Sequence, residues 1–134
     1  MNAFNILKVS ASAISAQRQR LNVMASNLAN VHSTRTENGE PYRRKDVVFS
    51  AFPIDSTLNG VTVAEIVEDP TPFNLVYDPS HPDADSQGYV KMPNINIIEE
   101  ITNMMMAFRA YEASVSAFNI SKSMFVKALE IGRV

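Results

Sequence analysis

Apolar residues recur every seven positions over two long stretches at the ends of the chain, and this spacing limits the fold more than any other feature. The first stretch, residues 4–31, contains neither proline nor glycine. Residues seven apart lie on one side of a helix and form the contact line of a coiled coil. The pattern predicts a long N-terminal helix with a contact line of Leu7, Ile14, Leu21 and Leu28, and with Met24 near an intervening position.

The second stretch, residues 97–131, carries two such rows and predicts a helix of roughly 50 Å. Asn96 precedes it and Glu99 follows three residues later, which is the pattern of an N-cap with its capping-box partner. Gly132 is a suitable stop. Lys122 interrupts the first row once. The first row comprises Ile101, Phe108, Val115 and Leu129, and the second comprises Met104, Tyr111, Phe118 and Phe125.

Between these stretches the helical period is lost. Four segments rich in β-branched and aromatic residues are bounded by proline and glycine, at residues 42–52, 60–68, 73–77 and 88–92. They predict about four strands in one small antiparallel sheet. The predicted fold class is therefore α+β, in which long N- and C-terminal helices pair as a coiled-coil-like bundle and a small antiparallel β insert lies between them.

Charge divides the chain in the same way. The net charge is +4 over residues 1–36, −6 over residues 37–95 and zero over residues 96–134. We therefore expect an N-terminal helix with its exit loop, a β-rich outer domain and a C-terminal helix within those bounds. The two helices together are expected to form one inner domain.

The composition excludes several classes of function. A net charge of −2 gives no general attraction to nucleic acid, and a chain without cysteine has no disulfides or thiolate chemistry. No apolar run resembles a signal peptide or a membrane span.

Both helical stretches are poor in charge, which suits close packing against several neighbours because buried charges are costly. We therefore expect a subunit that completes its fold by assembly, with no cofactor and no small-molecule substrate.

Residues 83–88, DADSQG, look like the opening of a calcium loop, with Asp83, Asp85 and Gly88 at its first, third and sixth positions. The twelfth position is Asn94, which cannot supply the two carboxylate oxygens that such a loop requires there. Four prolines in residues 69–82 exclude the helix that would enter the loop. We interpret the stretch as a turn between two strands and expect no metal site.

Catalysis is not predicted either. The two histidines, His32 and His81, have no pattern of nucleophile, base and orienting group around them. The single basic run is Arg43, Arg44 and Lys45, which we interpret as a solvated face of a strand that protects the edge of the sheet. The chain is therefore not expected to be an enzyme.

Two stretches carry a family resemblance. Residues 24–36, MASNLANVHSTRT, resemble the N-terminal signature of bacterial flagellar rod and hook proteins, with its N-L-A-N core at residues 27–30. Residues 78–124 are similar to the short proximal-rod members of that family. The resemblance implies a structural subunit of the flagellar basal body. Such a subunit assembles axially, connects the membrane ring to the distal rod and hook, and transmits torque for motility.

The resemblance also implies partners and a location. These are copies of the chain, other flagellar rod proteins, the rod-base adaptor, the membrane ring and the type III export apparatus. The subunit would reach the periplasmic rod without a cleaved signal peptide. The helix rows, together with the Asn27 and Asn30 amides that the signature supplies, would then form subunit interfaces. The expected interface set is Leu7, Ile14, Leu21, Met24, Asn27, Leu28, Asn30, Ile101, Met104, Phe108, Tyr111, Val115, Phe118, Phe125 and Leu129.

The residues alone leave another interpretation open. A cytoplasmic coiled-coil adaptor or secretion chaperone that binds a partner helix would show the same heptads. Such a protein would fold stably alone and stay in the cytoplasm.

Overall fold

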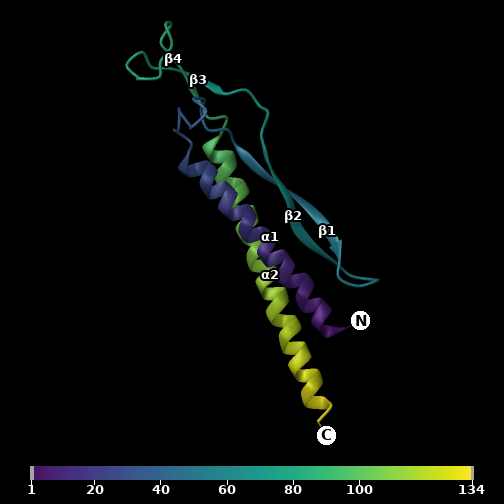
Figure 1. Ribbon diagram of the computed structural model, residues 1–134. Helices are drawn as coiled ribbons and strands as arrows, with labels where there is room; N and C mark the ends of the chain where they lie inside the picture. Colours follow the sequence, from purple (N-terminus) through teal and green to yellow (C-terminus); the bar gives the residue numbers. More distant parts are fainter. Residues whose placement is uncertain (1, 134) are drawn as a thin grey trace.

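A computed structural model describes residues 2–133 and shows two long antiparallel helices side by side, with a β insert between them in sequence (Figure 1). Helix α1 spans Ala3–Ala29 and helix α2 spans Ile97–Ile131. The rings of Phe4 and Phe125 lie 5.2 Å apart, so the start of α1 meets α2 before α2 ends. Residues 126–131 of α2 therefore extend beyond α1, and we call this segment the overhang.

The ends of both helices follow from local sequence. The Asn96 side chain caps α2 by accepting hydrogen bonds from the backbone N–H groups of Ile98 and Glu99, and Gly132 is the C-cap, as predicted. Asn2 caps α1 in the same manner. Within residues 2–133, no helix has the combination of length and apolar character that a bilayer crossing requires.

The insert has four strands, as predicted, but the expectation of one sheet is wrong because the strands form two separate antiparallel pairs. The first pair is β1 (Lys45–Pro53) with β2 (Asn59–Glu68), and the second is β3 (Asn74–Tyr77) with β4 (Tyr89–Met92). The long β1–β2 hairpin runs along the helices, whereas β3 and β4 lie beyond their upper end in Figure 1. The β1–β2 pair packs on α1, and within residues 2–133 neither strand of the β3–β4 pair packs on the other pair.

The β1–β2 hairpin packs closely against α1. Ser12 Oγ accepts a hydrogen bond of 3.1 Å from the Val61 N–H. A Cβ atom added at Gly60 would lie 3.0 Å from Ser12 Oγ, so a glycine suits this close approach of β2 to α1. Asn5 Nδ2 donates to Asp55 at 2.8 Å and ties the tip of the hairpin to the start of α1. Helix α1 is therefore covered by α2 and by this hairpin.

The core of a single chain is small. The fully buried apolar residues are Ala16, Met24, Val90, Ile95 and Ala107. The chain exposes 9049 Å² of surface. A compact monomer of 14.8 kDa would expose about 7,000 Å², roughly 2,000 Å² less. The single chain thus leaves open an area comparable to a substantial protein interface.

Candidate assembly interface

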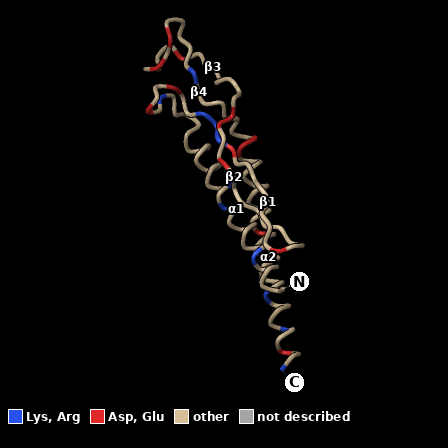
Figure 2. The backbone as a smooth tube through the Cα atoms, turned by 45° about the vertical axis from the view of Figure 1, so that its right-hand side comes forward, with Lys and Arg blue, Asp and Glu red and all other residues tan. Residues whose placement is uncertain are grey.

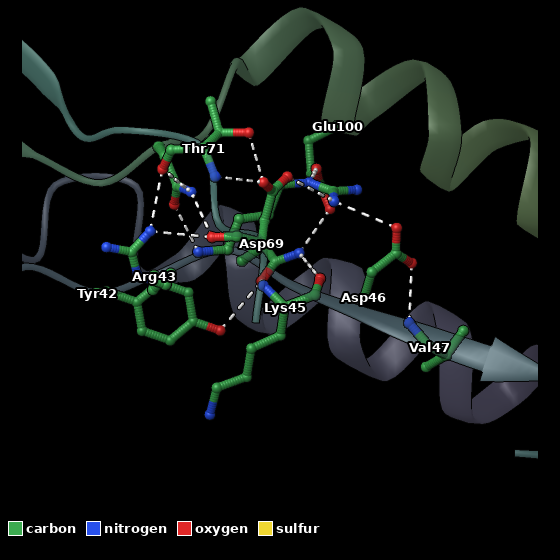
Figure 3. Close-up of polar contacts among 11 residues, drawn as sticks. Tyr42, Arg43, Lys45, Asp46, Val47, Asp69, Thr71 and Glu100 are labelled. Carbon is green, nitrogen blue, oxygen red and sulfur yellow. Dashed lines mark hydrogen bonds and ion pairs between the residues drawn. The ribbon is translucent and has the colours of Figure 1, made fainter. Parts of the chain in front are cut away.

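The end of α1, the start of β1 and the start of α2 meet at a polar junction (Figure 3). The Asn27 side chain is fully buried there. Its Nδ2 donates to the Lys45 carbonyl at 2.8 Å and to Glu100 Oε1 at 2.7 Å, and its Oδ1 accepts from the Lys45 N–H at 3.0 Å. One amide therefore ties both helices to the first strand. We define the polar junction as Asn27, Arg44, Asp69, Asn94 and Glu100.

An ion pair lies beside Asn27 at this junction. Arg44 Nε donates to Glu100 Oε2 at 2.8 Å, and Arg44 Nη1 lies 3.2 Å from Asp46 Oδ2 and 3.6 Å from Asp69 Oδ2. Glu100 is only 1% exposed. Burial alone would lower the pKa of Arg44, but the hydrogen bonds and charges of Glu100 and Asp46 together outweigh it and leave that pKa above its ordinary value. The buried carboxylate is tolerated because it is paired.

The remaining contacts of the junction fix the insert. The Arg44 N–H donates to Asn94 Oδ1 at 2.8 Å, and Asn94 Nδ2 donates to the carbonyls of Asp69 and Thr71 at 3.1 and 2.9 Å. Arg43 Nη1 reaches the same two carbonyls at 3.0 Å. The interpretation of this basic run as a solvated strand face is therefore wrong for Arg43 and Arg44, because their donors are used inside the subunit.

The acidic loop between β3 and β4 is tied to the exit loop of α1. Thr34 Oγ1 donates to Asp83 Oδ2 at 2.7 Å, and Arg35 pairs with Asp83 Oδ1. The Thr34 hydrogen bond and the charge of Arg35 lower the pKa of Asp83. Asp85 Oδ1 accepts from the backbone N–H groups of Gln87 and Tyr89, both at 2.9 Å. Within residues 2–133, no three metal-ligating side chains of His, Cys, Asp or Glu come together, and these carboxylates shape turns and tether the loop.

The two predicted rows of α2 face different surroundings. The row with Met104, Tyr111, Phe118 and Phe125 is half-buried along α1. The same side of α2 also carries Glu100, Ala107, Ser114 and Ser121. The other row is largely open, since Ile101, Phe108 and Leu129 are each about half exposed while Val115 is half-buried. Lys122 lies in this open row and is exposed, so it does not interrupt the packing between the two helices.

In α1, the predicted contact line packs within the chain. Met24 and Asn27 are buried, and the other residues of the predicted set are half-buried, namely Leu7, Ile14, Leu21, Leu28 and Asn30. Asn27 has no surface left to offer a neighbour. The role of the whole set in subunit contacts stays a prediction.

The outer face of α2 is the largest apolar surface of the helix pair. It exposes large apolar side chains over residues 97–108 and again over residues 120–131, whereas Phe4 is the exposed large apolar residue of α1. Figure 2 shows long tan stretches along the helices, with the red acidic positions gathered mainly toward the end away from the C-terminus. This face is suited to packing and offers no constellation for chemistry. Its residues are Ile97, Ile98, Ile101, Met105, Met106, Phe108, Ile120, Met124, Val126, Leu129 and Ile131.

Sequence reasoning missed the polar junction. Glu100 occupies the helix position four residues before Met104, so it belongs to the inward side of α2 although it is charged. The nearby basic run supplies the partner that a buried carboxylate needs. These two signals together would have placed Glu100 opposite Arg44. Asn94 carries no comparable signal in the sequence.

The chain matches known flagellar proteins along its whole length. A family model described as flagella basal body rod protein matches residues 7–35, and one described as flagellar basal body rod FlgEFG protein C-terminal matches residues 86–131. The flagellar basal-body rod protein FlgC of Escherichia coli O6:H1 is 48% identical over 99% of this chain and 100% of its own length. The Bacillus subtilis protein of that name is 47% identical, with 99% of this chain and 100% of the relative covered. The one from Borreliella burgdorferi is 42% identical over 98% of both chains. This chain therefore belongs to the FlgC family of flagellar basal-body rod proteins.

Proposed function

We propose that the chain, a structural and non-enzymatic subunit of the flagellar basal-body rod, assembles by packing the open face of α2 against neighbouring subunits. The observation that carries the proposal is the run of exposed apolar side chains along this 35-residue helix. Water contact with so much apolar surface is unfavourable, and a neighbouring helix removes it. The excess surface of the single chain has the size that such contacts need.

The helices and the insert have different places in the proposed rod subunit. The two helices form an inner domain, residues 37–95 form the outer domain, and the polar junction keeps the two at a fixed angle. Other rod proteins are the neighbours, with the rod-base adaptor and the membrane ring at one end and the distal rod and hook at the other. Torque passes through the subunit because its helices and its insert share buried polar contacts.

The location follows from the same role. The rod lies in the periplasm, and the subunit reaches it through the flagellar type III export apparatus without a cleaved signal peptide. Similarity to flagellar basal-body rod proteins over nearly the whole chain supports this location.

Phe108→Asp tests the proposed function. Phe108 is 51% exposed in the single chain, so the variant should fold as the parent does. A charge at this position should prevent subunit packing, and cells that carry the variant should be non-motile and lack rods. Phe108→Leu is the matched control and should preserve assembly. Cells with Phe108→Asp that swim normally would contradict the proposal and favour the adaptor interpretation, in which a stable monomer stays in the cytoplasm.

A further inference from the structure

Two Asn-Gly pairs occur in the chain, Asn38–Gly39 and Asn59–Gly60. Such a pair is chemically labile, because the amide nitrogen of the glycine can attack the asparagine side chain and glycine has no side chain to obstruct the attack. The attack requires a rotation of the backbone between the two residues. The two pairs therefore differ in reactivity if the fold permits this rotation at one pair and prevents it at the other.

The first pair lies at the tip of the loop that leaves α1. Residues 37–40 are all exposed. They form a tight turn, in which the Gly39 N–H donates to the Thr36 carbonyl at 2.9 Å and the Thr36 N–H donates to the Glu40 carbonyl at 2.8 Å. Gly39 has a φ of 78°, and beyond its chain neighbours no atom of residues 2–133 lies within 4 Å of a Cβ added there. The turn can therefore open without moving a side chain out of the core.

The second pair is fixed by its neighbours. Asn59 is paired with Pro53 in the β1–β2 ladder, and Gly60 is buried beside α1. The next residue, Val61, donates its N–H to Ser12 Oγ at 3.1 Å. A rotation between Asn59 and Gly60 would pull this part of the hairpin away from α1. The Asn59 side chain is exposed as well, so the two pairs differ in freedom of the backbone and not in access to water.

We propose that Asn38 is a site of spontaneous deamidation in the folded chain and that the fold protects Asn59 from the same reaction. The Gly39 nitrogen loses its proton to hydroxide and bonds to Cγ of Asn38. The Cγ–Nδ2 bond breaks, and ammonia leaves with a proton from water. Water then opens the resulting ring, either at Cγ to give aspartate or at the backbone carbonyl carbon to give isoaspartate, in which the chain continues through the side chain.

The products change the charge and the shape of the turn. Either product adds a negative charge between Glu37 and Glu40, in a segment that is already acidic. Isoaspartate also lengthens the backbone by a methylene group, so the turn cannot keep both backbone hydrogen bonds of Thr36. The hydrogen bond that closes the loop, from the Tyr42 N–H to the Ser33 carbonyl at 2.9 Å, lies outside the altered bond. The change should therefore stay within the turn and leave the polar junction folded.

Peptide mapping by mass spectrometry tests the difference between the two pairs. The purified full chain is incubated in mildly alkaline water enriched in the heavy oxygen isotope. The peptide that contains Asn38 should take up the isotope as it loses ammonia, and isoaspartate should be detected in it. The peptide that contains Asn59 should react at least about tenfold more slowly, because only the first turn opens without unfolding the hairpin. Equal rates in the folded chain, or faster reaction at Asn59, would overturn the proposal.

The same incubation in urea separates the effect of the fold from that of the sequence. In the unfolded chain both pairs should react at similar rates, since each is an asparagine followed by glycine. A difference that persisted in urea would contradict protection of Asn59 by the fold. Reaction of Asn38 in the unfolded chain but not in the folded chain would show that the turn does not open, and the proposal would fail.

Two substitutions confirm the site. Asn38→Gln should abolish isotope uptake in its peptide, because the longer side chain closes a less favourable ring, and it should leave the circular dichroism unchanged. Asn59→Gln is the matched control and should leave uptake at Asn38 unchanged. Uptake that persisted in Asn38→Gln would assign the reaction to another residue and refute the proposal.

Discussion

Helices α1 and α2 have the same heptad period but are covered on different numbers of sides. Helix α1 packs on α2 and also on the β1–β2 hairpin through Ser12 and Asn5. Its remaining exposed positions are mostly small or polar, such as Ala11, Ser15 and Asn22. Among the helices and strands of residues 2–133, helix α2 packs on α1 only, and many of its exposed positions are large and apolar. The period of a helix thus shows that it packs, and the chemistry of its outer positions shows how many partners it still needs.

At the polar junction the two helices are covered to a similar extent, because Asn27 of α1 and Glu100 of α2 both bind the insert there. At the opposite end, α2 is uncovered beyond Phe125. The subunit is therefore firmest at the junction and most dependent on neighbours at the overhang. The predictions below test this gradient.

The largest effect is expected for Arg44→Ala. Removing the guanidinium leaves the Glu100 carboxylate buried without its charge partner, which costs about 3–5 kcal/mol of unfolding free energy. Urea unfolding of the isolated chain, followed by circular dichroism, should show a partly unfolded protein even without denaturant. Lys45→Ala, next in sequence but with an exposed side chain, should change stability by less than about 0.5 kcal/mol.

A paired replacement separates charge from packing at the same site. Arg44→Met combined with Glu100→Leu removes both charges and should be much more stable than Arg44→Ala, because no unpaired group remains on either residue. Equal loss in the two variants would mean that the ion pair itself contributes little. The junction would then be held mainly by the Asn27 and Asn94 amides.

The next effect concerns the two sides of α2. Phe118 is half-buried against α1 and Ile120 is 60% exposed. Truncation of a fully buried phenylalanine costs roughly 3–5 kcal/mol, so Phe118→Ala should cost about 2 kcal/mol. Ile120→Ala should leave the isolated chain nearly unchanged in a urea titration. Similar losses for the two variants would mean that the inward side of α2 has been assigned incorrectly.

In cells, Phe118→Asp should abolish motility and leave rods incomplete, because it places an unpaired charge in the packing between the helices. The β insert should keep its fold, since its hairpins and the junction do not involve Phe118. Full-length rods in swimming cells would contradict the predicted register of the second row.

Much of this fold was predictable from the sequence because it depends on local patterns. The bounds of α2 follow from Asn96, Gly132 and the heptad row of Met104, Tyr111, Phe118 and Phe125 between them. The expectation of a single sheet was wrong, because strand patterns give no information on which hairpins lie side by side. Local propensity places strands, and tertiary packing decides how they pair.

The candidate interface was only partly predictable. Seven-residue spacing identified both rows of α2, but it could not tell which row packs within the chain and which stays open. Phe118 and Phe108 belong to different rows and look equivalent in sequence. The difference arises from the position of α1, which lies beside the row of Phe118. Glu100 was missed because a charged residue inside a helical contact line needs its partner to be known first.

Hydrogen exchange should reveal the gradient in the isolated chain. Residues 12–27 of α1 are covered by α2 and the hairpin, whereas residues 112–131 of α2 are covered on one side or not at all. Amides in the second segment should therefore exchange earlier than those in the first, with the overhang earliest. Equal, strong protection of both segments in a dilute monomer would contradict dependence on assembly. Addition of rod partners should slow exchange in α2 more than in α1.

The smallest effect concerns the contact that holds the hairpin tip on α1. The Asp55 carboxylate accepts hydrogen bonds from the Thr57 N–H and from the Asn5 side chain, which lower the pKa of Asp55 to about 2. Because the folded pKa lies below the unfolded value, this contribution to stability is present above about pH 4. It is lost as the pH falls through 2. The expected change in stability is small because the group is at the surface.

Carbon NMR of the Asp55 carboxyl, followed from pH 5 to about pH 1, measures this effect directly. Asn5→Ala should raise the pKa of Asp55 only part of the way to its ordinary value, because the Thr57 hydrogen bonds remain. In the same titration the Asn5 side-chain amide should shift together with the carboxyl, since the two groups are 2.8 Å apart. An Asp55 pKa unchanged by Asn5→Ala would show that the hairpin tip is not held on α1 in solution. Helix α1 would then be covered near its start by α2 alone, and the two helices would differ less than their packing indicates.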